Sequence, residues 1–129
     1  MRAVLLQVGR DWFALPVGSL REVVADPPVT PLPTAPATVR GLVNVRGQIV
    51  PLLDTAALLG LGSMEAVPFA AVLDSPLGPV GLATASVPEP AELGERVGPG
   101  HARGAVAAHT AGARVAVLLD PAVVLAPAS

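Results

Sequence analysis

An internal repeat is the feature that most constrains how this chain of 129 residues can fold. Residues 13–22 and residues 80–89 share the same apolar positions and end on a glutamate, at an offset of 67 (80 minus 13). Residues 49–54 and residues 115–120 are apolar runs that end on an aspartate, at an offset of 66 (120 minus 54). Two anchors at nearly one offset indicate a duplication. Each half has only about 60 residues, so we expect the halves to pack against each other.

Short apolar runs separated by turn residues predict β-strands throughout the chain. The apolar positions of residues 20–24 are compatible with either a further strand or one helical turn. Asp54 and Asp120 each precede a short apolar stretch and predict the N-caps of two short helices. Four pairs of runs predict hairpins: residues 4–8 with 12–15, 42–45 with 48–53, 68–73 with 80–83, and 104–108 with 114–119.

The repeat and the predicted strands together indicate an all-β fold of two tandem five-stranded barrels. A short helix is expected after the last hairpin of each barrel, where the two aspartates lie. Closing a small sheet into a barrel removes its exposed edges. The seam between two such barrels is a natural groove for a binding partner.

A proline-rich segment separates the first predicted strands from the rest of the first half. Residues 27–36 contain five prolines. Such a stretch can be a flexible linker, but proline also makes a chain stiff and extended. Val29 and Leu32 are interleaved with the prolines, and no hairpin requires them. An ordered arm that contacts a partner is therefore the second interpretation.

Composition excludes several classes of function. The eight basic residues are outnumbered by ten acids, which gives a net charge of −2 and no basic face for nucleic acid. The longest stretch without a charged residue is residues 75–88, well short of the roughly 20 residues that a membrane-spanning helix needs. The first ten residues lack the apolar core of a signal peptide. We therefore expect a cytoplasmic protein that does not insert into a membrane.

One motif carries a family resemblance. From Gly41 to Asp54 the chain has the pattern Gly-x-x-Asn-x-Arg-Gly-x-x-Val-Pro-x-x-Asp. With residues 20–23 and 29–36, this motif resembles the CheW chemotaxis adaptor family, most clearly over residues 4–60 and more weakly to residue 125. The resemblance implies two Src-homology-3-like barrels in tandem, without enzymatic activity or a cofactor.

The resemblance also implies a domain division and a role. Residues 1–129 would form a single CheW-like domain made of two intertwined small barrels, with approximately residues 12–66 in the first barrel and residues 67–125 plus the N-terminal strand in the second. Members of the family join the cytoplasmic tip of methyl-accepting receptors to the regulatory domain of the histidine kinase CheA. An accessory member that binds only one of these partners is the alternative.

Site residues can be carried over from the motif position by position. Arg46 matches an arginine that the family needs for signalling, within the Asn44-x-Arg46-Gly47 hairpin, and Glu22 matches an acid that lies close enough to pair with it. An arginine beside a turn glycine can also be simply solvated, and an exposed pair stabilises by only about 0–1 kcal/mol. The spacing of the motif favours a functional Arg46.

Two further groups of residues match positions in partner interfaces of the family. Gly41 and Val87 match positions associated with receptor binding in the groove between the barrels. Val29, Thr30 and Leu32 match an arm that tends to face the kinase. Gly41 could instead serve a backbone conformation that other residues avoid, and Val87 could be a core residue.

The second half departs from the family pattern. Its last hairpin, from Gly104 to Asp120, spans 16 positions against 13 from Gly41 to Asp54, and it lacks the Asn-x-Arg-Gly string. The prolines at 88 and 90 predict a strand that is at an edge or broken. We expect these changes to affect the contact that the second barrel makes with a kinase domain.

An aspartic protease is the rival interpretation from another class. Residues 52–56 resemble the Asp-Thr-Gly/Ala loop of retroviral-type proteases, in which two carboxylates share a proton. Helix N-capping explains Asp54 more simply, and its repeat counterpart Asp120 lacks the following hydroxyl residue. His101 and His109 stand alone, without cysteine or carboxylates at ligand spacing, so no metal site is expected.

Overall fold

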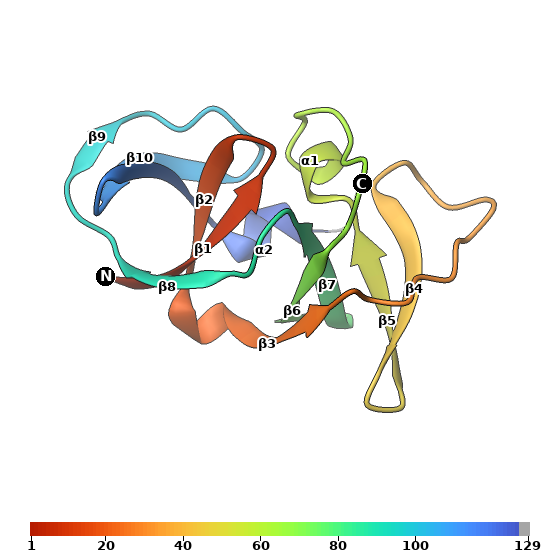
Figure 1. The fold of residues 1–129 in the computed structure, drawn as a ribbon. Coiled ribbons are helices and arrows are strands. Elements are labelled where there is room, and N and C mark those ends of the chain that lie inside the picture. The colour runs from red at the N-terminus through yellow and green to blue at the C-terminus, as the bar shows by residue number, and fades with distance from the viewer. Residues whose placement is uncertain (127–129) are drawn as a thin grey trace.

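The computed structural model describes residues 1–126 and contains two curled β-sheets, seen left and right in Figure 1. The six-stranded sheet has the order β8-β1-β2-β11-β10-β9 and the five-stranded sheet the order β3-β6-β7-β5-β4. The first sheet contains β1 (Arg2–Val8), β2 (Asp11–Pro16), β8 (Glu89–Glu92), β9 (Arg96–Gly98), β10 (Ala105–Ala111) and β11 (Arg114–Leu119). The second contains β3 (Leu20–Ala25), β4 (Val39–Val45), β5 (Gln48–Leu53), β6 (Phe69–Ser75) and β7 (Gly78–Thr84).

Three short helical segments complete the described part of the chain. A 3₁₀ turn (Val17–Ser19) joins β2 to β3, so the region around residues 20–24 is a strand and not a helical turn. Helices α1 (Thr55–Leu58) and α2 (Pro121–Val124) follow β5 and β11, as predicted. Asp54 and Asp120 are their N-caps, and each side chain accepts a hydrogen bond from a backbone N–H of the first turn.

Each sheet closes through one long, bent strand. In the six-stranded sheet, β8 pairs with β1 and its continuation β9 pairs with β10. Between them, the Leu93 N–H donates to Met1 and the Gly94 N–H donates to Thr110. Because β8 and β9 are two parts of one strand, the sheet is a five-stranded barrel. Strand β8, which contains Pro90, stands at the end of the strand order, in agreement with the prediction of an edge strand, and the interruption between β8 and β9 lies further along, at residues 93–95. In the other sheet, β3 pairs with β6, and Thr30 further along the chain bridges to Leu42 on β4.

The two halves of the chain exchange hairpins, which corrects the division expected from the sequence. Strand β2, expected in the first barrel, pairs in parallel with β11. Strands β6 and β7, expected in the second barrel, form one sheet with β3, β4 and β5. Residues 12–66 and 67–125 are therefore not the two barrels. Each barrel instead combines a hairpin from one half with a bent strand and a hairpin from the other.

The pairing registers reproduce the internal repeat. The parallel pair Ala14–Leu118 of one barrel corresponds to Gly81–Leu52 of the other, at offsets of 67 and 66. Both barrels carry a bulge at the same place, between Val39 and Gly41 and between Ala105 and Ala107. Duplicated registers and bulges indicate that the two barrels descend from one repeated unit.

The same correspondence corrects the expected difference in hairpin length. The Asp120 N–H donates to Gly104, and the Asp54 N–H donates to Thr38. Gly104 is thus the counterpart of Thr38, and the counterpart of Gly41 is Ala107, so the two hairpins span the same number of residues. The expected difference of 16 against 13 positions arose because Gly104 was taken as the counterpart of Gly41.

One apolar core joins the two barrels. Its largest cluster takes buried side chains from both sheets, among them Leu6 and Leu15 from one sheet and Leu52 and Leu82 from the other. A second, smaller cluster of mostly alanines lies in the barrel formed by the six-stranded sheet, with Trp12 packed against it. Because the main cluster crosses the boundary between the sheets, we expect the barrels to be stable only together.

No helix within residues 1–126 is long and apolar enough to cross a membrane.

Candidate partner-binding surface

The β4–β5 hairpin ends in a turn whose geometry is costly for its first residue. Val45 pairs with Gln48, which leaves Arg46 and Gly47 as a two-residue loop. Their φ angles are +53° and +83°, as in a type I′ turn, where asparagine and glycine are preferred. Asn44 braces the turn, because its Oδ1 accepts a hydrogen bond of 2.8 Å from the Gly47 N–H. An arginine at positive φ is uncommon, so local stability does not explain Arg46.

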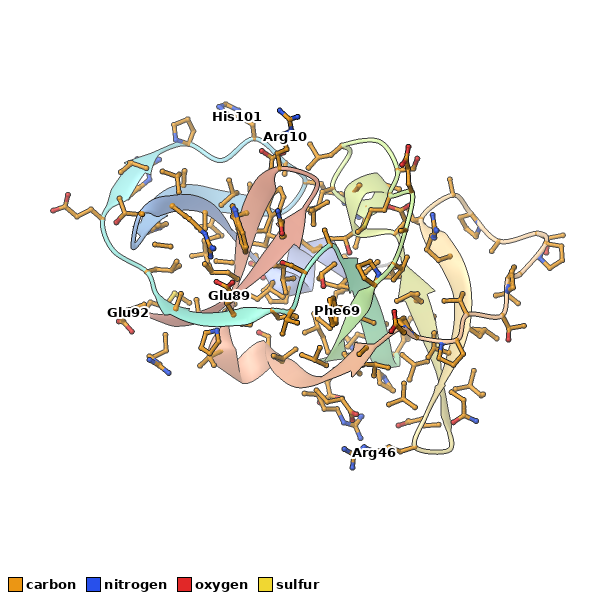
Figure 2. The ribbon with its side chains drawn as sticks, viewed as in Figure 1. Arg10, Arg46, Phe69, Glu89, Glu92 and His101 are labelled. Carbon is orange, nitrogen blue, oxygen red and sulfur yellow. The ribbon has the colours of Figure 1, made fainter. Side chains whose placement is uncertain are left out.

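Arg46 and Glu22 form the pair that the resemblance implied. Arg46 Nε donates to Glu22 Oε1 across 3.3 Å, from the hairpin tip to strand β3. The arginine side chain is 84% exposed and the glutamate 23% exposed, so the pair contributes about 0–1 kcal/mol to stability. Figure 2 shows Arg46 at the free end of the hairpin, at the periphery of the molecule. A hollow of about 100 Å³ lies beside the pair.

The proline-rich segment is held against β4 and is an ordered arm. Thr30 and Leu42 exchange two backbone hydrogen bonds of 2.8 Å each. Pro27 is buried, and Val29 is half-buried against the main core. Leu32 extends beyond these anchors and is 41% exposed. The arm thus presents an apolar side chain to solvent while its own backbone is fixed at the bridge.

The structure separates Gly41 from Val87. Gly41 is buried on β4 beneath Val29 and Thr30. Val87 lies in the connection from β7 to β8, which crosses from one sheet to the other, and its side chain is 53% exposed. The interpretation of Val87 as a core residue is therefore wrong. A groove of about 550 Å³ at the seam is lined by Val8, Met64 and neighbouring residues, and neither Gly41 nor Val87 is part of its lining.

Asp54 is buried, and both of its carboxylate oxygens accept hydrogen bonds from the backbone. Its Oδ1 accepts from the Ala57 N–H and its Oδ2 from the Met64 N–H, both at 3.0 Å. Arg40 Nη1 lies 3.5 Å from the same Oδ2 and donates to the Met64 carbonyl. The aspartate therefore ties α1, the following loop and β4 together, which accounts for its place in the motif.

Removing this carboxylate gives a prediction with a matched control. We expect Asp54→Ala to lower the free energy of unfolding by about 2–4 kcal/mol, since it removes a cap and leaves the buried Met64 N–H unsatisfied. The control, Asp120→Ala, removes only an exposed cap and should cost about 1 kcal/mol. Urea denaturation measures both values. Equal costs would show that the Met64 and Arg40 contacts do not matter.

A second ionic cluster, on the six-stranded sheet, was not predicted from the sequence. Arg114 pairs with Glu89 on β8, and its guanidinium lies 3.9 Å from the centre of the Trp12 ring. Glu89 is the repeat counterpart of Glu22, so the offset of 67 could have located it. Both barrels thus tie the bent strand to the following hairpin through a glutamate and an arginine.

Other chemistry is sparse in the described part of the chain. Among residues 1–126, no three histidine, cysteine, aspartate or glutamate side chains are grouped to hold a metal ion. His109 Nδ1 lies 3.0 Å from the Gly94 carbonyl, within the barrel framework. The arrangement offers polar and apolar contacts at a hairpin tip, along an arm and on a connection between sheets.

The fold and these surface features define a class of protein, a tandem of small closed β-barrels that share one core. Comparison with known proteins then gives the family. A family model described as a CheW-like domain matches residues 2–128, so the chain belongs to the CheW-like domain family.

Individual relatives agree with this assignment. The chain is 37% identical over 62 residues to the chemotaxis protein CheW of Rhizobium meliloti strain 1021, which is 48% of this chain and 40% of that protein. It is 37% identical over 54 residues to protein PilI of Pseudomonas aeruginosa, which is 42% of this chain and 30% of that protein. The matched stretch therefore spans less than half the length of each relative.

A solved structure confirms the fold. The scaffolding protein TtCheW from Thermoanaerobacter tengcongensis superposes with a TM-score of 0.82, over 98% of this chain and 92% of its own. Sequence identity is 16%, so this likeness concerns the fold alone. The two-barrel, all-β architecture predicted from the sequence is thereby confirmed.

Proposed function

We propose that this chain is a non-enzymatic adaptor of a bacterial chemosensory system that couples methyl-accepting receptors to a CheA-type histidine kinase in the cytoplasm. The observation that carries this proposal is the position of Arg46. Arg46 adds little to stability, yet its backbone has a positive φ at the tip of a hairpin. The turn is stabilised by the hydrogen bond from the Gly47 N–H to Asn44, and the Arg46 side chain is held by Glu22. Such strain is common where a residue serves binding rather than folding. Membership of the CheW-like domain family supports this class of partner.

Two surfaces are available for two partners. The first, which we call the kinase face, consists of the Arg46 hairpin tip and the arm residues Val29, Thr30 and Leu32. Both lie along strand β4, because the arm bridges to Leu42 and the hairpin tip follows it. The second surface is the connection around Val87, which we assign to the receptor tip. No cofactor is required for either role.

The test is to titrate the folded chain separately with the kinase regulatory domain and with a receptor cytoplasmic tip, using isothermal titration calorimetry. The adaptor proposal expects both partners to bind. Binding of only one would identify the accessory alternative. A folded chain that binds neither partner would overturn the proposal.

Exposed residues on the two surfaces should separate the two affinities. We expect Leu32→Asp to weaken kinase-domain binding by about tenfold or more and to leave receptor binding unchanged, and Val87→Asp to do the reverse. Both side chains are about half exposed, so neither change should unfold the chain. Each variant is the control for the other in the same pair of titrations. If both variants weakened the same partner, the assignment of the two surfaces would be wrong.

A further inference from the structure

Gly41 differs from the other strand glycines in what lies above its Cα atom. A Cβ added there would overlap the carbonyl oxygen of Thr30 and would lie 2.8 Å from Val29 Cγ1. The φ of Gly41 is +151°, in a region that favours glycine. The clash includes backbone of the arm, which cannot rotate aside as a side-chain end can. A side chain at position 41 is therefore incompatible with the arm in its present place.

The other barrel shows that the local bulge does not itself require glycine. The same bulge occurs there with Ala107 in the place of Gly41. Ala107 is buried and has no positive φ. Two things differ at position 41: its φ is +151°, and in the first barrel the arm packs directly on it. A bulge at this register therefore forms without glycine, and the close contact with the arm is particular to position 41.

The position of the arm depends strongly on its contact with β4 at Gly41 and Leu42. Between Thr30 and Ala37, the arm makes backbone hydrogen bonds only to Leu42, to Val39 and within itself, among the described residues. On its other side, an open groove of about 620 Å³ separates it from the loop of residues 63–67. Figure 1 shows the segment between β3 and β4 looping outward beside β4. Loss of the Thr30–Leu42 bridge would leave the segment free to shift.

We propose that Gly41 is a positioning residue for the arm, which fixes where Val29, Thr30 and Leu32 meet the kinase regulatory domain. This inference rests on the proposed adaptor function and assigns Gly41 to the kinase face instead of the receptor groove. Gly41 acts through the arm, because it is buried and has no side chain to offer a partner. A change at this position therefore affects one partner and spares the other.

The test compares Gly41→Ala with Gly81→Ala. Gly81 is buried in the same sheet. The atom nearest to a Cβ there would be the end of the Leu52 side chain, at 3.2 Å, and the Pro51 carbonyl oxygen would lie in ordinary contact at 3.7 Å, so Gly81→Ala controls for a general loosening of the barrel. We expect Gly41→Ala to abolish the hydrogen-exchange protection of the Thr30 and Leu42 amides, which bond across the bridge to the arm, while the amides that bond β4 to β5 stay protected. Affinity for the kinase domain should fall by about tenfold, and affinity for the receptor tip should not change. Gly81→Ala should leave both affinities and the arm amides unchanged.

A second variant covers the case in which Gly41→Ala does not fold. Thr30→Pro removes the arm's N–H donor to Leu42 without adding bulk to β4, and it should produce the same loss of kinase affinity. Retained protection of the arm amides in Gly41→Ala, an equal loss for both partners, or an unchanged kinase affinity would each overturn the inference. Failure of the wild-type chain to bind either partner would instead overturn the proposed function.

Discussion

Replacing Arg46 by glutamate is expected to weaken binding of the kinase regulatory domain by tenfold or more, equivalent to at least about 1.4 kcal/mol. The change places a second carboxylate beside Glu22 at the hairpin tip, where the native chain presents a cation. The free energy of unfolding should change by no more than about 1 kcal/mol, because the native pair is exposed. Calorimetric titration and urea denaturation of the same preparations measure the two quantities.

Two controls separate binding from folding in this experiment. Arg46→Gly removes the side chain and relieves the positive φ, so it should lose affinity while keeping or gaining up to about 1 kcal/mol of stability. Arg10→Glu makes the same charge change at the exposed β1–β2 turn of the other barrel and should leave kinase binding unchanged. If Arg46→Glu unfolded the chain, Arg46 would be structural. If Arg10→Glu weakened binding equally, net charge alone would account for the effect.

Replacing Leu82 by alanine is expected to destabilise both barrels together, by about 2–5 kcal/mol. Leu82 lies on β7 in the five-stranded sheet, is fully buried and belongs to the cluster that also contains Leu6 and Leu15 of the other sheet. A loss of this size is a large share of the roughly 5–15 kcal/mol that typically stabilises a domain. Because the core is shared, unfolding should remain a single transition.

The one tryptophan of the chain allows the unfolding of the unchanged barrel to be followed separately. Trp12 lies in the six-stranded sheet, on the barrel that the substitution does not change, so its fluorescence reports on that barrel. Trp12 fluorescence and far-ultraviolet circular dichroism should shift to the same lower midpoint in urea. Ile49→Ala, at an exposed position in the same sheet as Leu82, should change stability by less than about 0.5 kcal/mol. A fluorescence midpoint that stayed in place in Leu82→Ala would show that the barrels unfold independently.

The hairpins and helix caps could be predicted from the sequence because local signals specify them. The turn residues of each hairpin and the aspartates before α1 and α2 act within a few positions of where they stand. The exchange of hairpins could not be predicted in this way. Strands β2 and β7 are copies of one another in the repeat, so either one matches the pairing requirements of β5 or β11. Only the long-range packing of the folded chain distinguishes the two arrangements.

The same distinction between local signals and long-range packing applies to the candidate site. The Arg46–Glu22 pair followed from a motif whose members lie on one hairpin and the strand beside it. The positive φ of Arg46 was not foreseen, because a turn type depends on the pairing register and not on the dipeptide alone. Gly41 and Val87 were expected in one groove, yet the contact that explains Gly41 comes from the arm. Val87 is exposed because its connection crosses between the sheets instead of entering a core.

The adaptor function proposed above requires this small chain to hold two partners at once, on surfaces that do not overlap. Size-exclusion chromatography with light scattering, on a mixture of the chain, the kinase regulatory domain and a receptor tip, tests it directly. We expect one species with the mass of all three components. Displacement of one partner by the other, with only binary complexes at every ratio, would contradict it.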